Sequence, residues 1–552
     1  MGTANDSKAI ILFSDGTGNS SAKLFKTNVW RLYEAIDLGP APGGGGREQI
    51  AYYSNGVGTS GFRPLALLGG IFGYGLKANI LDLYKYLCRN YRDGDTIHVF
   101  GFSRGSFTVR LLVGLIVSQG ILRGDSPDVG PDEDKLAYLA RAAYRAFARE
   151  AWPNRWLAKQ VARMTRRVRD GILDLHRRAT GRDRYDPAHN VMTDVAFVGV
   201  WDTVAAYGGP IVEITRGIDD WIWPLTMPNY QLSPRVLQAR HALSLDDERD
   251  SFQPLLWDEV REDMLVRQGG FVKEIIEGHV VETVRKVPRG RLKQVWFAGM
   301  HADVGGGYPD ESLSYVSLLW MIQELDGSLR MIGPLVERVR SMANIFGPIH
   351  DSRAGLGAYY RYQPRRIAAM LEGPQDNPAF VATRALRDPA IADAGYVMPG
   401  GGDPSTASGV DHDPHLAQLA RRIRSDHGLL CEVRIHESVL ARIAEGTDGY
   451  APIGLPPRVR RGIRRRAARR RIRGTASTLA GRGVSRQDMH GQRNVEAYRL
   501  PRRRRCCGCM ARTPGRDLGH GVEAPNTLLP HRRFLGLVGR HPAMGPLLHW
   551  RG

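Results

Sequence analysis

The chain has 552 residues, of which 42% are hydrophobic and 24% are charged. This is the balance of a globular protein, and it excludes a collagen-like, membrane-embedded or wholly disordered chain. The formal net charge of +20 lies entirely in residues 458–552, which hold 24 Arg, no Lys and four acidic residues, whereas residues 1–457 hold 53 basic and 53 acidic residues. The basicity is therefore no argument for nucleic-acid binding by residues 1–457.

Residues 8–122 alternate between strand and helix patterns. Short apolar runs bounded by turn residues predict the strands, and apolar residues at helical spacing predict the helices. The predicted strands are 9–13, 49–56 and 96–100, and the predicted helices are 28–36, 78–91 and 107–119. Alternation of this kind is typical of a mostly parallel sheet with helices on both faces, so we predict an α/β fold.

Two long segments interrupt the alternation. Residues 123–190 are Arg-rich with a helical pattern, and residues 205–290 form a second insertion. Between them, 191–204 returns to a buried strand, and within 291–308 another strand runs into a Gly-rich loop. We interpret the two segments as caps over one side of the sheet, so that residues 8–457 form a single catalytic domain.

Residues 458–552 differ in character from the rest of the chain. One interpretation is a disordered basic arm that binds acidic lipid or nucleic acid by charge alone. A second is solvated charge without a task, and a third is the product of a shifted reading frame in GC-rich DNA, which gives Arg, Gly, Ala and Pro without Lys. The three cysteines of this tail are fewer than the four ligands of a structural zinc site, so no metal is expected.

Gly101-Phe102-Ser103-Arg104-Gly105 is a G-x-S-x-G motif that lies between a predicted strand and a predicted helix. This is the strand–turn–helix setting of a nucleophile elbow, in which the serine hydroxyl projects above the sheet at the helix N-terminus. Gly101 and Gly105 lack a Cβ, so the strand and the helix can approach each other closely. The alternative is a Gly-rich turn whose serine caps the helix, but the flanking elements favour Ser103 as the nucleophile.

A serine nucleophile needs a general base and a third group that orients the base. Two positions fit the chain order Ser, Asp, His that is typical of the elbow fold. Asp202 follows the strand at 195–201, and His301 follows the strand at 295–298 and opens a Gly-rich loop. We therefore predict Asp202 as the acid and His301 as the base.

Other assignments of these two roles stay open on the sequence. An Asp after a strand is commonly a helix N-cap, and Asp303 is a second candidate for the acid, although it lies unusually close to the predicted base. His241, His279 and His436 are rival bases. None of these three lies where an apolar strand runs into a Gly-rich loop.

An oxyanion hole requires backbone N–H groups that point at the developing negative charge. One is predicted from Arg104, the residue after the serine, and another from the loop at residues 14–19, where Gly16 and Thr17 are the candidates. A phosphate-binding loop is the rival interpretation of residues 14–19. That loop lacks both the P-loop and the dinucleotide-binding patterns, so no nucleotide cofactor is expected.

Four short motifs in this order resemble a known family: FSDGTGN (13–19), GFSRGS (101–106), GVWDTV (199–204) and AGMHADVGGGY (298–308). They are similar to the type VI secretion lipase effector family with an α/β-hydrolase catalytic domain, and the similarity extends over about residues 8–457. The resemblance implies a Ser–Asp–His hydrolase with an α/β-hydrolase-like sheet, a phospholipase A activity, and no cofactor. It places the nucleophile, acid and base at Ser103, Asp202 and His301.

Three functions remain to be distinguished. The first is a hydrolase of glycerophospholipid esters, for which apolar residues 65–74 and 221–227 would meet the membrane surface. The second is a soluble esterase for small acyl substrates. The third is a non-catalytic protein that binds membranes or nucleic acid through its basic tail.

The partners and the location of the protein follow from the same analysis. The N-terminus lacks the basic start and apolar stretch of a cleavable signal, so we expect a protein that is cytoplasmic as synthesised. The resemblance implies export by a type VI apparatus, together with a component of that apparatus and a cognate immunity protein as partners. No specific nucleic acid is expected.

Overall fold

The computed structural model describes ten stretches of the chain. They are residues 7–16, 24–40, 47–56, 70–123, 132–151, 185–205, 230–354, 360–367, 433–455 and 495–498. All of them belong to the first of two compact units, which spans residues 1–502. Outside the described residues lie several predicted features: Thr17, residues 65–69, 152–184 and 221–227, and nearly all of the basic tail.

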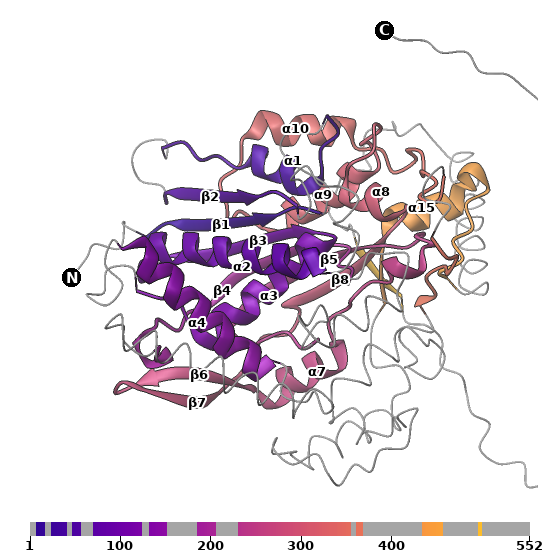
Figure 1. Ribbon diagram of the computed structural model, residues 1–552. Helices are drawn as coiled ribbons and strands as arrows, with labels where there is room; N and C mark the ends of the chain where they lie inside the picture. The colour runs from indigo at the N-terminus through magenta and orange to yellow at the C-terminus, as the bar shows by residue number, and fades with distance from the viewer. Residues whose placement is uncertain are drawn as a thin grey trace, which may run out of the picture. The chain divides into compact units, whose positions relative to one another are not determined.

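An eight-stranded sheet forms the centre of this unit, in the order β10-β9-β8-β5-β4-β3-β1-β2 (Figure 1). All neighbours pair in parallel except β9 and β10, which are antiparallel. The strands are β1 (Ala9–Ser14), β2 (Gln49–Ser54), β3 (Thr96–Phe102), β4 (Val195–Trp201), β5 (Val236–Ser244), β8 (Leu292–Phe297), β9 (Val433–His436) and β10 (Val495–Tyr498). The predicted α/β class with a mostly parallel sheet is confirmed.

Helices cover both faces of the sheet because successive strand side chains point to opposite sides. Ile10 and Leu12 of β1 pack with one group of helices, while Ile11 and Phe13 pack with the other. The first group is α2 (Gly70–Asn90), α3 (Arg104–Gln119) and α4 (Glu133–Ala151), and the second is α1 (Asn28–Ala35), α9 (Ser314–Glu324) and α10 (Gly333–Met342). The two groups lie on opposite sides of the strands in Figure 1.

Smaller elements complete the described part of the chain. They are the helices α7 (Glu259–Gln268), α8 (His301–Gly305) and α15 (Glu437–Glu445), the hairpin β6 (Gly270–Ile276) with β7 (His279–Arg285), and short 3-10 turns at Pro187–His189, Asp250–Phe252 and Thr447–Gly449. The hairpin forms its own two-stranded sheet. None of the described helices combines the length and the apolar character that crossing a membrane requires.

Two segments differ from the sequence predictions. The segment 205–290 is not a single insertion, because it contains β5, which pairs with β4 on one side and β8 on the other. Within the basic tail, β10 pairs with β9, so at least these four residues are part of the sheet rather than of a disordered arm. In the other predicted insertion, the helical pattern of 123–190 is realised in α4.

The parallel arrangement brings the carboxyl ends of β1, β3, β4, β5 and β8 to one edge of the sheet. In open α/β sheets this edge is where ligands bind. Asp15, Ser103 and Asp202 directly follow β1, β3 and β4, and His301 comes four residues after the end of β8, so residues separated by almost 300 positions converge there.

A substitution at Gly199 in β4 would test the packing between the sheet and α9. A Cβ at this position would lie 2.6 Å from the ring of Phe100 and 2.9 Å from the sulfur of Met321. We expect Gly199→Ala to destabilise the fold by about 1–3 kcal/mol, because a close-packed core cannot take another methyl group. Gly333→Ala is the matched control, since nothing lies within 4 Å of its Cβ position at the start of α10. Equal midpoints of thermal unfolding in the two variants would contradict this packing.

Candidate active site

The turn between β3 and α3 holds Ser103 in a strained backbone conformation, with φ 58° and ψ −123°. Such a conformation costs about 1–3 kcal/mol for a residue with a side chain and persists only where the surroundings enforce it. Here the Ser103 amide donates a hydrogen bond to the carbonyl oxygen of Trp201, at the end of β4, over 3.0 Å. The turn is thereby tied to the neighbouring strand.

Gly101 and Gly105 are required by close backbone approaches in this turn. A Cβ on Gly101 would lie 2.8 Å from the carbonyl oxygen of Gly105, and a Cβ on Gly105 would overlap the carbonyl oxygens of Ser14 and Asp15. The loop that follows β1 therefore packs directly against the start of α3. Any larger residue at these two positions would push the three segments apart.

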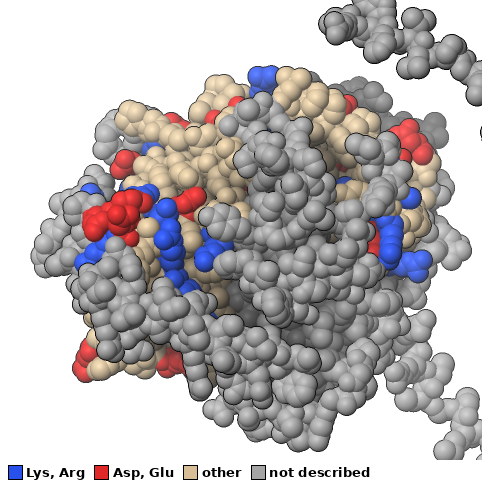
Figure 2. Space-filling view, viewed as in Figure 1, with Lys and Arg blue, Asp and Glu red and all other residues tan. Residues whose placement is uncertain are grey.

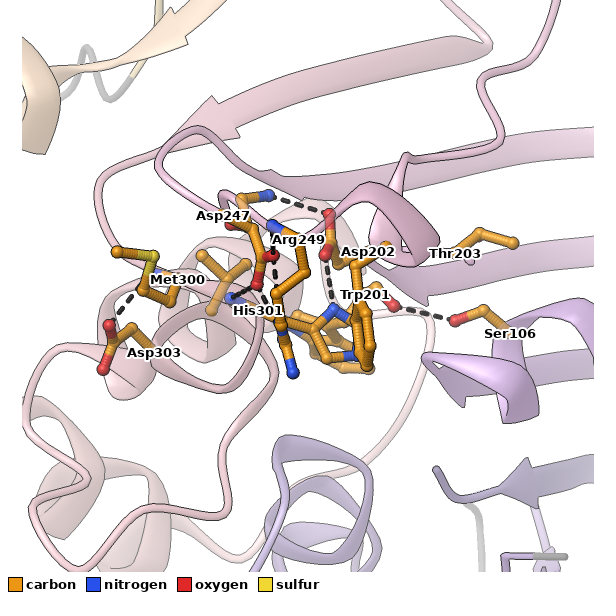
Figure 3. A network of polar contacts seen from close by, with 12 residues as sticks. Ser106, Trp201, Asp202, Thr203, Asp247, Arg249, Met300, His301 and Asp303 are labelled. Carbon is orange, nitrogen blue, oxygen red and sulfur yellow. Dashed lines mark hydrogen bonds and ion pairs between the residues drawn. The ribbon is translucent and has the colours of Figure 1, made fainter. Parts of the chain in front are cut away.

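Asp202 and His301 face each other across the ends of β4 and β8 (Figure 3). Nδ1 of His301 lies 2.5 Å from Oδ2 of Asp202, and both side chains are buried. Asp202 itself sits in a left-handed turn, with φ 39°, and its amide donates to the carbonyl oxygen of Ala242 over 2.7 Å. The two residues predicted as acid and base are thus in direct contact.

Aromatic rings enclose the imidazole of His301. Its ring centroid lies 4.6 Å from that of Phe102 and 5.0 Å from that of Phe252. Because Phe102 directly precedes Ser103, the imidazole lies beside the strained turn. The Ser103 side chain makes no hydrogen bond to a described residue. The contact between this turn and His301 is made by the ring of Phe102.

The carboxylate of Asp202 is held by groups from three segments. Oδ1 accepts hydrogen bonds from the amide of Ser244 at 3.0 Å and from Arg365 at 2.7 Å. Oδ2 accepts from Arg365 at 2.9 Å and contacts His301. Arg365 did not emerge from the sequence, because an arginine in the run QPRR carries no motif or periodicity that points to a partner.

The electrostatic setting keeps this pair in a defined protonation state. Burial by itself would raise the pKa of Asp202, but the charge of Arg365 and the hydrogen bond of His301 hold that pKa well below its usual range. Burial lowers the pKa of His301, and this outweighs the opposite effect of Asp202. A neutral imidazole beside an ionised carboxylate is the state that a general base needs before reaction.

A second charged pair supports the loop that carries His301. The backbone amide of His301 donates to Oδ2 of Asp247 over 3.1 Å, and Asp247 in turn pairs with Arg249 at 2.7 Å (Figure 3). The guanidinium of Arg249 lies 3.4 Å from the ring centroid of Phe252, which itself packs on the imidazole. The acidic run after β5 was the one available signal for Asp247.

Asp303, the second candidate for the acid, has a different partner. Its Oδ1 lies 2.6 Å from Nδ1 of His350, and its Oδ2 accepts the amide of Met300 over 2.9 Å. The ring of His350 stacks on Tyr308 with 4.1 Å between centroids. Asp303 therefore shapes the start of α8 and forms its own carboxylate–imidazole pair.

The three rival histidines have other surroundings. Nε2 of His241 accepts the amide of Thr203, and its Nδ1 lies 3.3 Å from Gln294, so this imidazole is a buried polar link in β5. His436 accepts the amide of Ser438 at the start of α15, and His279 is exposed on β7. Within the described residues, no group of three or more His, Cys, Asp or Glu is placed to hold a metal ion.

The residues predicted to form the oxyanion hole differ in how readily their backbone amides could donate to a substrate. Arg104 is the first residue of α3, where backbone N–H groups point out of the helix end. The amide of Gly16, in contrast, donates to the carboxylate of Asp15 over 2.6 Å, and this bond would have to break before Gly16 acts as a donor. That carboxylate is buried and also binds Thr27 and Tyr53. Thr17 lies outside the described residues.

The chain is similar to several known proteins. A search of curated proteins finds an uncharacterized protein of Saccharomyces cerevisiae, YEL023C, with 27% identity over 265 residues, which is 46% of this chain and 33% of that protein. Among solved structures, the Tle1 effector bound to the VgrG spike of the type 6 secretion system has 17% identity and a TM-score of 0.29, covering 56% of this chain and 52% of that one. An uncharacterized protein from Pseudomonas aeruginosa has 15% identity and a TM-score of 0.31, covering 84% and 62%. The chain thus spans a third to under two thirds of these relatives.

The family of the chain follows from a match to a family model. Residues 8–324, more than half of the chain, match the family described as T6SS, phospholipase effector Tle1-like, catalytic domain. This range includes the turn of Ser103, Asp202 and His301, and it begins one residue before β1. The chain belongs to the family of Tle1-like phospholipase effectors of the type VI secretion system, as the resemblance of its motifs predicted.

Proposed function

We propose that the protein is a serine hydrolase that cleaves carboxylic esters of glycerophospholipids, a phospholipase of the A type. The observation that carries the proposal is the buried contact of Asp202 with His301 beside the strained turn of Ser103. Membership of a phospholipase effector family supports the lipid ester as substrate.

In this proposal, the reaction proceeds through an acyl-enzyme. Ser103 Oγ attacks the ester carbonyl carbon while His301 takes the hydroxyl proton, and Asp202 holds the imidazole in the required tautomer. The amide of Arg104 stabilises the tetrahedral oxyanion. The C–O bond to the glycerol breaks as His301 returns the proton to the leaving alkoxide. A water molecule, deprotonated by His301, then attacks the acyl carbon, and the bond to Ser103 Oγ breaks as His301 returns the proton to that oxygen and the fatty acid leaves.

The family also suggests where the protein acts. We propose that a component of a type VI secretion apparatus carries it to a membrane surface in a target cell, and that a cognate immunity protein protects the producer. No specific nucleic acid is part of this proposal.

Replacement of the nucleophile gives the first test. We expect Ser103→Ala in the full-length chain to lower fatty-acid release from phosphatidylglycerol and phosphatidylethanolamine vesicles by up to about 10⁶-fold, because the covalent step is lost. Ser118→Ala, a change on the same helix whose hydroxyl bonds only the carbonyl of Leu115 among described residues, serves as control and keeps wild-type turnover.

A soluble short-chain ester, assayed in parallel, separates the two hydrolase functions. Release from vesicles that depends on Ser103 supports the phospholipase. Cleavage of the soluble ester without any vesicle activity supports a small-substrate esterase instead. Undiminished activity in Ser103→Ala would show that the nucleophile is another residue.

A pair of carboxylate variants tests the choice of acid. We expect Asp202→Asn to reduce kcat by about 10⁴-fold, since the amide favours the wrong imidazole tautomer. Asp303→Asn removes a carboxylate that contacts His350 and should stay within about tenfold of the wild type. Steady-state kinetics on the same ester compares them, and the reverse order of the two losses would assign the acid to Asp303.

The pH dependence follows from the environment of His301. Burial lowers the pKa of its imidazole below the ordinary value of 6.5, so the base stays unprotonated through the neutral range. Activity should therefore persist below pH 6.5 and fall only when the pH drops through the lowered pKa. A profile of kcat/KM against pH measures this, and an acid limb centred above pH 7 would contradict the proposed base.

A further inference from the structure

We propose that Arg365 is a positioning residue of the hydrolase site. Its guanidinium holds Asp202 ionised and in the orientation in which the carboxylate receives Nδ1 of His301. This inference rests on the function proposed above. Arg365 lies outside the part of the chain that matches the family profile, and its hydrogen bonds to described residues go to Asp202, Ser244 and Phe252 rather than to Ser103 or His301.

Each terminal nitrogen of the Arg365 guanidinium has two hydrogen-bond acceptors. Its two terminal nitrogens bind the two oxygens of Asp202 at 2.7 and 2.9 Å, so the contact is bidentate. The same two nitrogens donate to the carbonyl oxygens of Ser244 and Phe252, each at 2.5 Å. Both charged side chains of the pair are fully buried. Neither partner can rotate without losing several hydrogen bonds at once.

Only an arginine fits this arrangement. The planar fork of the guanidinium matches the two carboxylate oxygens and fixes the plane of the carboxylate, whereas a lysine would present a single point charge. The plane matters here because Oδ2 of Asp202 is shared between Arg365 and His301. The loss of the fork would free the carboxylate to turn away from the imidazole.

Arg365 also sets the charge balance around the pair. The titratable and charged groups that face Asp202 or His301 are Arg365, Arg249, Asp247 and His241, and Asp246 faces Arg365. Arg365 offsets the charge of Asp202, and Arg249 offsets that of Asp247. Without the charge of Arg365, the carboxylate and imidazole together would bind a proton at higher pH, and the active unprotonated form would be confined to more alkaline solution.

Three variants of the full-length protein test this role. Arg365→Gln removes the charge and the fork, and Arg365→Lys keeps the charge alone. The control is Arg291→Gln, because Arg291 is also buried, binds Glu262 through two contacts of 2.7 Å and donates to backbone carbonyls. Arg291 directly precedes β8, at the opposite end of that strand from His301, about 20 Å away at 3.3 Å per residue.

The expected changes concern kcat and the pH profile rather than KM. Arg365→Gln should lower kcat about 100-fold, as expected for a misplaced catalytic pair, and move the acid limb of kcat/KM upward by about one pH unit. Arg365→Lys should lose kcat with an acid limb close to that of the wild type. Arg291→Gln should lose thermal stability without a change in either quantity. A folded Arg365→Gln with the wild-type profile, or equal shifts in Arg291→Gln, would overturn the proposal.

Two outcomes need a separate decision. If Arg365→Gln does not fold, Arg365→Lys decides the question, because wild-type kcat in that variant would refute the need for the fork. If the wild type shows no hydrolysis that depends on Ser103, the proposed function fails. The titration of His301, followed by ¹³C-histidine NMR with His301→Asn for assignment, then tests Arg365 without a substrate. An upward shift of the midpoint in Arg365→Gln supports the proposal, and an unchanged midpoint rejects it.

Discussion

The carboxylate of Asp202 joins segments of the chain that are otherwise far apart in sequence. It binds the amide of Ser244 at the end of β5, the imidazole of His301 after β8, and the guanidinium of Arg365. A buried carboxylate is unfavourable unless hydrogen bonds and a counter-charge replace its water shell, and these three groups provide both. The position of each partner is therefore constrained by the same ion, and the site holds its geometry only while all of them are in place.

The parallel sheet explains why these partners can meet. Five parallel strands deliver their carboxyl ends to one edge, and two of the residues at this edge, Ser103 and Asp202, have left-handed backbone conformations. Strain of this kind is kept where surrounding contacts over-determine the backbone. The tie from the Ser103 amide to Trp201 and that from the Asp202 amide to Ala242 are contacts of this type. The two strained residues are thus held by backbone hydrogen bonds to β4 and β5, and one of them, Asp202, also belongs to the buried ion pair.

The turn of Ser103 and the places of Asp202 and His301 after strands could be predicted from the sequence, because each depends on a pattern of neighbouring residues. The turn of Ser103 has glycines at fixed spacing between an apolar strand and a helix, and the strands before Asp202 and His301 are short apolar runs. β5 was missed because VLQARHALS mixes polar and apolar residues within a long segment of uncertain pattern. Arg365 was missed for a different reason: its role depends on contacts with residues more than 100 positions away, which no local pattern encodes.

The short strand β10 has a consequence for how the protein is handled. Its four residues lie well inside the Arg-rich tail, yet they pair with β9 at the margin of the sheet. A chain cut at the change of composition, after residue 457, would leave the backbone N–H and C=O groups of β9 open along one side. Unpaired strands of this kind recruit other chains and promote aggregation. A shortened protein is therefore better ended beyond Tyr498, near residue 502 where the first compact unit ends, than at the boundary that composition suggests.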